Sequence, residues 1–84
     1  DEGLKALSAR VVRAAPNDVG ANEMRAVVLA GQCGGVWEVG PRSAAELMEA
    51  ATHYDRGAAL HPAPAGKAQL AGAAAWCRRR AEAM

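Results

Sequence analysis

The segment AAELMEAATHYDRGAALHP, residues 44–62, decides the fold of this chain. Small residues at Ala50 and Gly57 flank the aromatic residue Tyr54 at spacings of four and three, which places all of them on one side of a helix. Pro62 follows five positions after Gly57 and ends the helix, because proline cannot continue the backbone hydrogen-bond pattern. The sequence therefore predicts a helix that a neighbouring helix approaches closely at Ala50 and Gly57.

The start of this helix is set by Ser43. Ser43 and Glu46 have the spacing of a capping box, in which each side chain accepts a hydrogen bond from the backbone N–H of the other residue. The predicted helix therefore covers residues 43–60.

Three further helices are predicted from apolar residues that recur three and four positions apart. The first, residues 2–15, ends before Pro16. The second, residues 18–30, contains the run Val27-Val28-Leu29, which is apolar nearly all round, and is expected to be central. The fourth, residues 64–83, begins with Pro64 in its first turn. The apolar stripes consist of Leu4, Leu7, Val11 and Ala14 in the first helix, Met24, Val27 and Val28 in the second, and Leu70, Ala74, Cys77, Ala81 and Met84 in the fourth.

Residues 31–42 are predicted to form a loop between the second and third helices. They contain four glycines, too many for a helix, and the segment is longer than most connections within a helix hairpin. One hypothesis is that Trp37, with Val36 and Val39, inserts into a pocket on a partner protein. The other is that these side chains fold back over the groove between the second and third helices and complete a small core.

The composition favours a small helical domain that depends on its neighbours. The chain has 84 residues, no Phe and 4% aromatic residues, so we expect a single domain with a core of closely packed small side chains. A formal net charge of +1 is too small to steer the chain toward nucleic acid or an anionic membrane. No apolar run approaches the roughly 18 residues of a membrane span. A protein partner is therefore expected, with membrane association only at the periphery and through such a partner.

The first residue is Asp1 and not Met. The sequence is therefore interpreted either as part of a longer protein or as the product left after a targeting segment is removed. A soluble or peripheral protein, intracellular or organellar, fits both interpretations.

The sequence lacks the usual catalytic, metal and nucleotide motifs. Cys33 and Cys77 lie far apart without CxxC or Cys/His spacing, so neither a disulfide nor a zinc site is predicted and reduced thiols are expected. Gly66-Lys67 lacks the other residues of a phosphate-binding loop. No catalytic residue and no cofactor is predicted. His61 is expected at a helix end, and His53 on a polar face with Glu46, Glu49 and Arg56.

The order Ala50, Tyr54, Gly57 and Pro62 resembles the second helix of a tetratricopeptide (TPR) repeat, a helix hairpin of 34 residues. Pro62 lies 46 positions after Pro16, and the predicted loop accounts for the excess of about 12 residues. The chain would then resemble one whole repeat with one helix of a neighbouring repeat on each side.

The match is uneven along the chain. Ala71-Gly72 stands where the family usually has Leu-Gly, but the second helix has Arg25-Ala26 at the corresponding place. Sel1-like and other helix-hairpin repeats therefore remain open.

The resemblance implies an all-α module of TPR-like antiparallel hairpins that acts by protein–protein contact, as a scaffold, assembly or accessory subunit of a larger complex. In that family the first helix of each hairpin lines the inner surface. The residues implied there are Gly20, Glu23, Met24 and Val27, followed by Gly66, Gln69, Leu70 and Ala73. The Lys and Asn residues with which chaperone-binding members clamp a peptide carboxylate are absent from this set.

Trp76, on the flank of the fourth helix beside Arg80, is expected to cover the exposed end or to mark where further helices stack. The predicted partner-binding residues are Glu23, Val27, Val36, Trp37, Val39, Gln69 and Trp76.

The main alternative is a small nucleic-acid-associated helical domain. It would use the arginines at the end of the fourth helix, Arg78, Arg79 and Arg80, with Lys67. A more distant alternative is a fragment of an enzyme whose catalytic residues lie outside this segment.

Overall fold

The computed structural model describes residues 2–31 and 43–84, and within these two ranges the chain forms four α-helices and no strand. The helices are α1 (Glu2–Ala14), α2 (Val19–Ala30), α3 (Ala44–Leu60) and α4 (Pro64–Glu82). The all-α prediction with four helices is confirmed, and each predicted boundary lies within one or two residues of the observed one. The predicted loop lies outside the described residues except for Gly31.

Local sequence signals fix the helix ends. The Ser43 hydroxyl accepts from the backbone N–H of Glu46, and the Glu46 carboxylate accepts from that of Ser43, each at 3.0 Å, which confirms the capping box. Asp18 caps α2 by accepting from the N–H of Ala21 at 2.8 Å. Gly31 ends α2 with a φ of 72°, a left-handed conformation that favours glycine.

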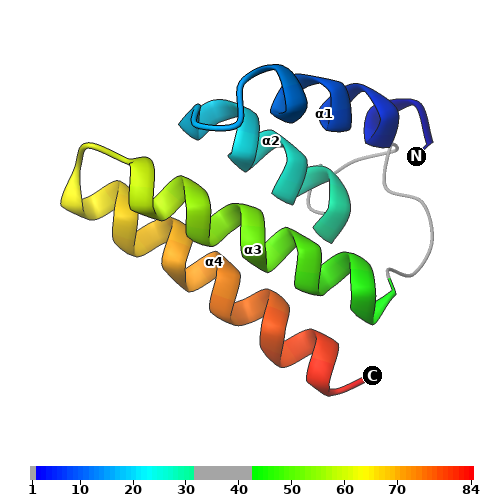
Figure 1. Ribbon diagram of the computed structural model, residues 1–84. Helices are drawn as coiled ribbons and strands as arrows, with labels where there is room; N and C mark the ends of the chain where they lie inside the picture. Colours follow the sequence, from blue (N-terminus) through cyan, green and yellow to red (C-terminus); the bar gives the residue numbers. More distant parts are fainter. Residues whose placement is uncertain (1, 32–42) are drawn as a thin grey trace.

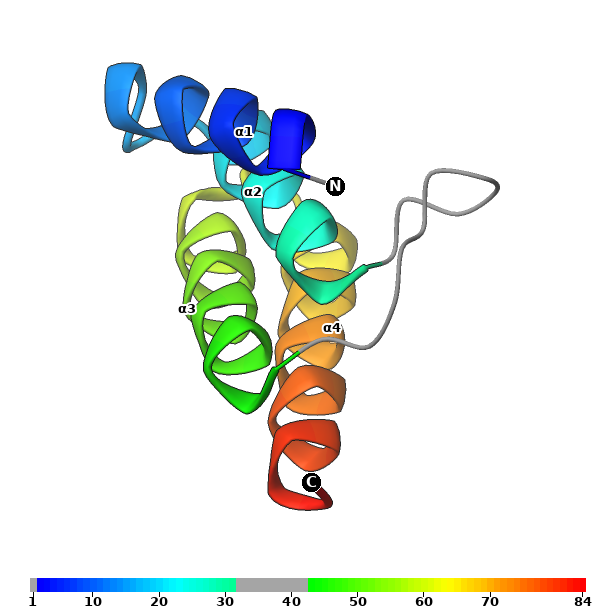
Figure 2. The same ribbon diagram turned by 90° about the vertical axis from the view of Figure 1, so that its right-hand side faces the viewer.

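The helices stack in layers. α3 and α4 form an antiparallel hairpin, α2 lies over that pair, and α1 lies on the outer side of α2 (Figures 1 and 2). The most extensive contacts join α3 to α4, followed by α2 to α3 and then α1 to α2. α1 is therefore the most peripheral helix.

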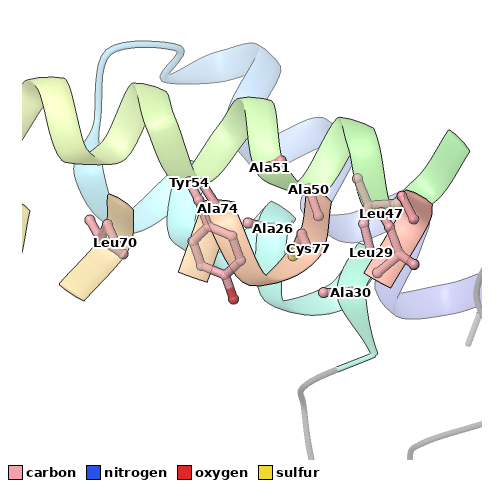
Figure 3. Packing of buried hydrophobic residues seen from close by; sticks show 11 residues of the cluster. Ala26, Leu29, Ala30, Leu47, Ala50, Ala51, Tyr54, Leu70, Ala74 and Cys77 are labelled. Carbon is pink, nitrogen blue, oxygen red and sulfur yellow. The ribbon is translucent and has the colours of Figure 1, made fainter. Parts of the chain in front are cut away.

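The core lies between α2, α3 and α4 (Figure 3). Most of its side chains are small, as the composition predicted, and Leu47 is the largest side chain that is fully buried. Gly57 permits α3 to cross close to α4, because a Cβ atom on Gly57 would lie 3.3 Å from Leu70 Cδ1 of α4. The core residues are Ala26, Leu29, Ala30, Leu47, Ala50, Ala51, Tyr54, Leu70, Ala74, Cys77 and Ala81.

Some predicted stripe residues are not buried. In α1, Leu7 is 40% exposed and Ala14 is exposed, because α1 packs mainly against one helix, α2. Met84, predicted on the apolar line of α4, lies beyond the end of that helix and is 63% exposed. The expectation that these side chains face a core is therefore wrong.

Candidate interaction groove and buried polar interface

An open groove follows the junction of α1 and α2. α1 contributes Leu4, and α2 contributes residues that recur along one face at helical spacing. Met24, Val27 and Val28 make the groove mainly apolar, and Gly20 adds no side chain to it. The lining residues are Leu4, Gly20, Glu23, Met24, Val27 and Val28.

This groove brings together the α2 residues that were expected on an inner surface, Gly20, Glu23, Met24 and Val27. The corresponding residues of α4 do not join them. Leu70 is only 5% exposed and packs in the core beneath Gly57, so the expectation that it lines an open surface is wrong.

The other predicted partner-binding residues lie elsewhere. Gln69 and Trp76 are exposed on α4, which contributes nothing to the groove. Gly72 is also exposed on α4, with no atom within 4 Å of the place its Cβ would take, so no described helix packs closely on it. Val36, Trp37 and Val39 lie outside the described residues, and their role in partner binding stays a prediction.

A buried amide joins the α1–α2 turn to α3. The side chain of Asn22, in α2, is fully buried. Its Nδ2 donates to the carbonyl oxygens of Pro16 and Asp18, both at 3.0 Å. This assigns Nδ2 as the donor end, and the remaining oxygen, Oδ1, lies 3.1 Å from Nδ1 of His53.

His53 lies beside Glu49, as predicted for the polar face of α3, and that part of the face is turned toward α2. When the ring is neutral, Nδ1 carries the proton and donates to Asn22, because Asn22 Oδ1 can only accept. Nε2 then lies 3.5 Å from the Glu49 carboxylate. Burial lowers the pKa of His53 below its usual 6.5. Arg25 and Arg56 also lower this pKa, whereas Glu49 raises it. The neutral ring is therefore the form that the fold favours.

Arg25 of α2 connects three helices. Its Nη1 donates to the carbonyl oxygen of Lys5 at 2.8 Å and to the Ser8 hydroxyl at 3.1 Å, both in α1. Its Nη2 donates to Glu49 of α3 at 3.3 Å. A second ion pair joins Lys5 to Glu46 of α3 at 2.5 Å. The Lys5 ammonium, together with the backbone N–H of Ser43, lowers the pKa of Glu46 to about 2.

Sequence reasoning missed Ser8, Asn22 and Arg25, which form this interface. One signal was present for Asn22, which stands four and seven positions before the core residues Ala26 and Leu29 and thus falls on their stripe. A polar side chain on a buried stripe needs hydrogen-bond partners, so it indicates a polar contact between helices.

The α4 surface holds the arginines of the nucleic-acid hypothesis. Arg78 forms an ion pair with Asp55 of α3. The guanidinium of Arg80 lies 5.7 Å from the centre of the Trp76 ring, as their spacing on α4 suggested. Trp76 itself is 38% exposed. Cys77 is fully buried beside them, and burial raises the pKa of its thiol, which suits the packing role predicted for it.

The corner between α3 and α4 is fixed by three residues. The His61 ring accepts from the N–H of Ala63 at 3.1 Å, and it occupies the space beside Gly66, where a Cβ atom would lie 2.1 Å from His61 Cε1. Lys67 Nζ donates to the carbonyl oxygens of Ala58 and Ala59 at the end of α3, both at 3.1 Å. The Gly66-Lys67 pair therefore stabilises a helix corner.

Among residues 2–31 and 43–84, no three His, Cys, Asp or Glu side chains are grouped so that they could hold a metal ion. No helix in these ranges has both the length and the apolar character needed to cross a lipid bilayer. Comparison of the chain with protein-family models, curated proteins and solved structures finds no match.

Proposed function

We propose that this chain is a protein–protein interaction module, a scaffold, assembly or accessory subunit of a larger complex, in the manner of a TPR-like repeat. The observation that supports this proposal is the open apolar groove on α1 and α2. Its occupant is an apolar helix or extended segment of another protein, because such segments insert side chains at regular spacing into a groove of this kind.

The groove also carries a charge that a partner can use. Glu23 is exposed, and no hydrogen bond or ion pair within the described part of the chain engages its carboxylate. A lysine or arginine of the bound segment would pair with Glu23 and fix the orientation in which the segment lies.

A peptide-display selection against the folded chain tests the proposal. We expect the selected peptides to bind the wild type and to lose at least tenfold in affinity on Met24→Asp, which places a charge in the groove. Met48→Asp is the matched control, since Met48 is 46% exposed on α3 and does not line the groove. Peptides that bind both variants equally, or a selection that yields no binders, would contradict the proposal.

A second selection, against the Glu23→Lys variant, tests whether the charge at position 23 selects the charge of the bound segment. Peptides selected on the wild type should be enriched in Lys and Arg, and those selected on Glu23→Lys in Asp and Glu. If both selections give the same charges while Met24→Asp still abolishes binding, the groove binds a partner but Glu23 does not select it.

The structure gives no specific support to the nucleic-acid alternative. Arg78 and Arg80 contact Asp55 and Trp76, and Lys67 contacts the end of α3. Polyanion binding that falls steeply between about 50 and 200 mM salt would favour that alternative.

A further inference from the structure

α1 is attached to the rest of the molecule in a different way from the other helices. The hydrophobic core runs through α2, α3 and α4, and none of the described α1 side chains belongs to it. Of the described α1 side chains, the one that is buried is the polar Ser8. The apolar side chains of α1 remain partly or largely exposed, and Figure 2 shows α1 at the outer edge of the stack. Apolar burial therefore contributes less to the attachment of α1 than to that of the other three helices.

Polar contacts link α1 to the rest of the fold. Arg25 reaches from α2 to the Lys5 carbonyl oxygen and the Ser8 hydroxyl, while its other end pairs with Glu49. Lys5 forms the ion pair with Glu46 of α3. When α1 leaves, water can solvate each of these groups, so their separation costs less than exposing a core of the same size.

The face of α2 beneath α1 is apolar. Ala21 and Val28 are each 4% exposed but do not belong to the core cluster, and they share one helical face with Arg25. Because Arg25 points at α1, that face is the one α1 covers. Val28 also lines the groove, so the covered face is continuous with it.

We propose that α1 separates from α2 as a unit while α2, α3 and α4 stay folded, and that the contacts of Arg25 hold α1 in its docked position. Opening extends the accessible apolar surface of α2 from Met24 to Ala21 and Val28, which are each 4% exposed while α1 is in place. The opening of α1 does not depend on the partner proposed above, because it is a property of the chain alone.

Native-state hydrogen exchange of the whole chain in low urea tests the proposal. In the wild type, α1 amides should exchange at least about tenfold faster than those of α3 and α4, with a weaker dependence on urea, because they open with less surface. Equal rates and equal urea dependence in α1, α3 and α4 would overturn it, because the molecule would then open as one unit.

Two substitutions test whether Arg25 holds α1 in its docked position. In Arg25→Met, α1 amides should exchange as in an unstructured peptide while α3 and α4 amides stay protected. Arg10→Met is the matched control, since Arg10 is exposed on α1, and it should leave exchange unchanged. Loss of protection in α1, α3 and α4 together in Arg25→Met, or equal effects of the two substitutions, would overturn the role of Arg25.

A milder variant covers the case in which Arg25→Met does not fold. Glu46→Gln removes the ion pair with Lys5 but keeps a side chain that can complete the capping box. It should raise exchange in α1 several-fold more than in α4. Equal increases in the two helices would count against a separately opening α1.

Discussion

Asn22 satisfies three polar groups on two segments, the α1–α2 turn and α3, and this makes it a sensitive residue of the fold. Its fully buried amide contacts the carbonyl oxygens of Pro16 and Asp18 and the ring of His53. Asn22→Ala leaves the Pro16 carbonyl oxygen and the His53 ring without this partner, whereas the Asp18 carbonyl oxygen still accepts from the backbone N–H of residue 22. We expect the free energy of unfolding to fall by about 2 kcal/mol. Urea denaturation measures the change. Asn17→Ala, in the same turn but exposed, is the control and should change it by less than about 0.5 kcal/mol.

His53 makes stability depend on pH. Its pKa in the folded chain is lowered by burial, so the unfolded chain binds the proton more readily. The contribution of the neutral ring is complete above the unfolded value of about 6.5 and is lost as the pH falls through that value toward the lower folded pKa. The groups that act on the ring are Glu49 and Arg56 of α3, with Asn22 and Arg25 of α2.

We therefore expect the chain to be less stable in urea at about pH 5.5 than at about pH 7.5. His53→Gln should remove most of this difference, whereas His61→Gln should retain it. An NMR titration of His53 with a midpoint at or above that of a histidine in a short peptide would contradict the assignment.

These residues show which parts of the site could be predicted. The Ser43–Glu46 capping box involves neighbours in sequence, so its spacing alone identified it. The Asn22–His53 contact joins positions 31 apart, and it becomes visible only when α2 is packed on α3. For the same reason, the position of His53 on a polar helix face did not show that α2 packs against its ring.

Among whole elements, α3 and α4 depend on Gly57 for their close crossing. Gly57→Leu should destabilise the chain by about 1–3 kcal/mol, because the new side chain collides with Leu70. Gly72→Leu is the matched control in the next helix, where the space is open, and it should stabilise by about 0.5–1 kcal/mol through helix propensity. Thermal unfolding of both variants distinguishes them. A Gly57→Leu variant as stable as the wild type would show that the crossing can widen freely.

Helix boundaries were predictable because caps and prolines act locally. Pro16, Ser43, Pro62 and Pro64 each mark an end that the structure places within two residues. The buried face of α1 was not predictable, since an apolar stripe is buried only where another element covers it. α1 meets mainly α2, so half of its predicted stripe stays exposed.

For the whole molecule, the small core predicts modest stability. Among residues 2–31 and 43–84, seven of the thirteen buried hydrophobic residues are alanines, and one helix lies outside the core cluster. Each buried alanine removes little apolar surface from water, so the hydrophobic contribution is small for a chain of this length. We expect the isolated chain to be helical and to melt below about 70 °C by circular dichroism. A bound partner should raise the melting temperature, whereas cooperative melting above that limit in the free chain would contradict this expectation.

The α3–α4 corner has a consequence for the order in which the molecule folds. His61, Gly66 and Lys67 make contacts that span fewer than ten positions, so closing this hairpin costs little chain entropy. Attaching α2 requires closure of the longer segment between positions 31 and 43, and α1 adds only peripheral contacts. We therefore expect the hairpin to be formed in the folding transition state, with α1 docking after the barrier. In stopped-flow kinetics, Lys67→Met should mainly slow folding and Arg25→Met should mainly speed unfolding, and the reverse pattern would place the nucleus in α1 and α2.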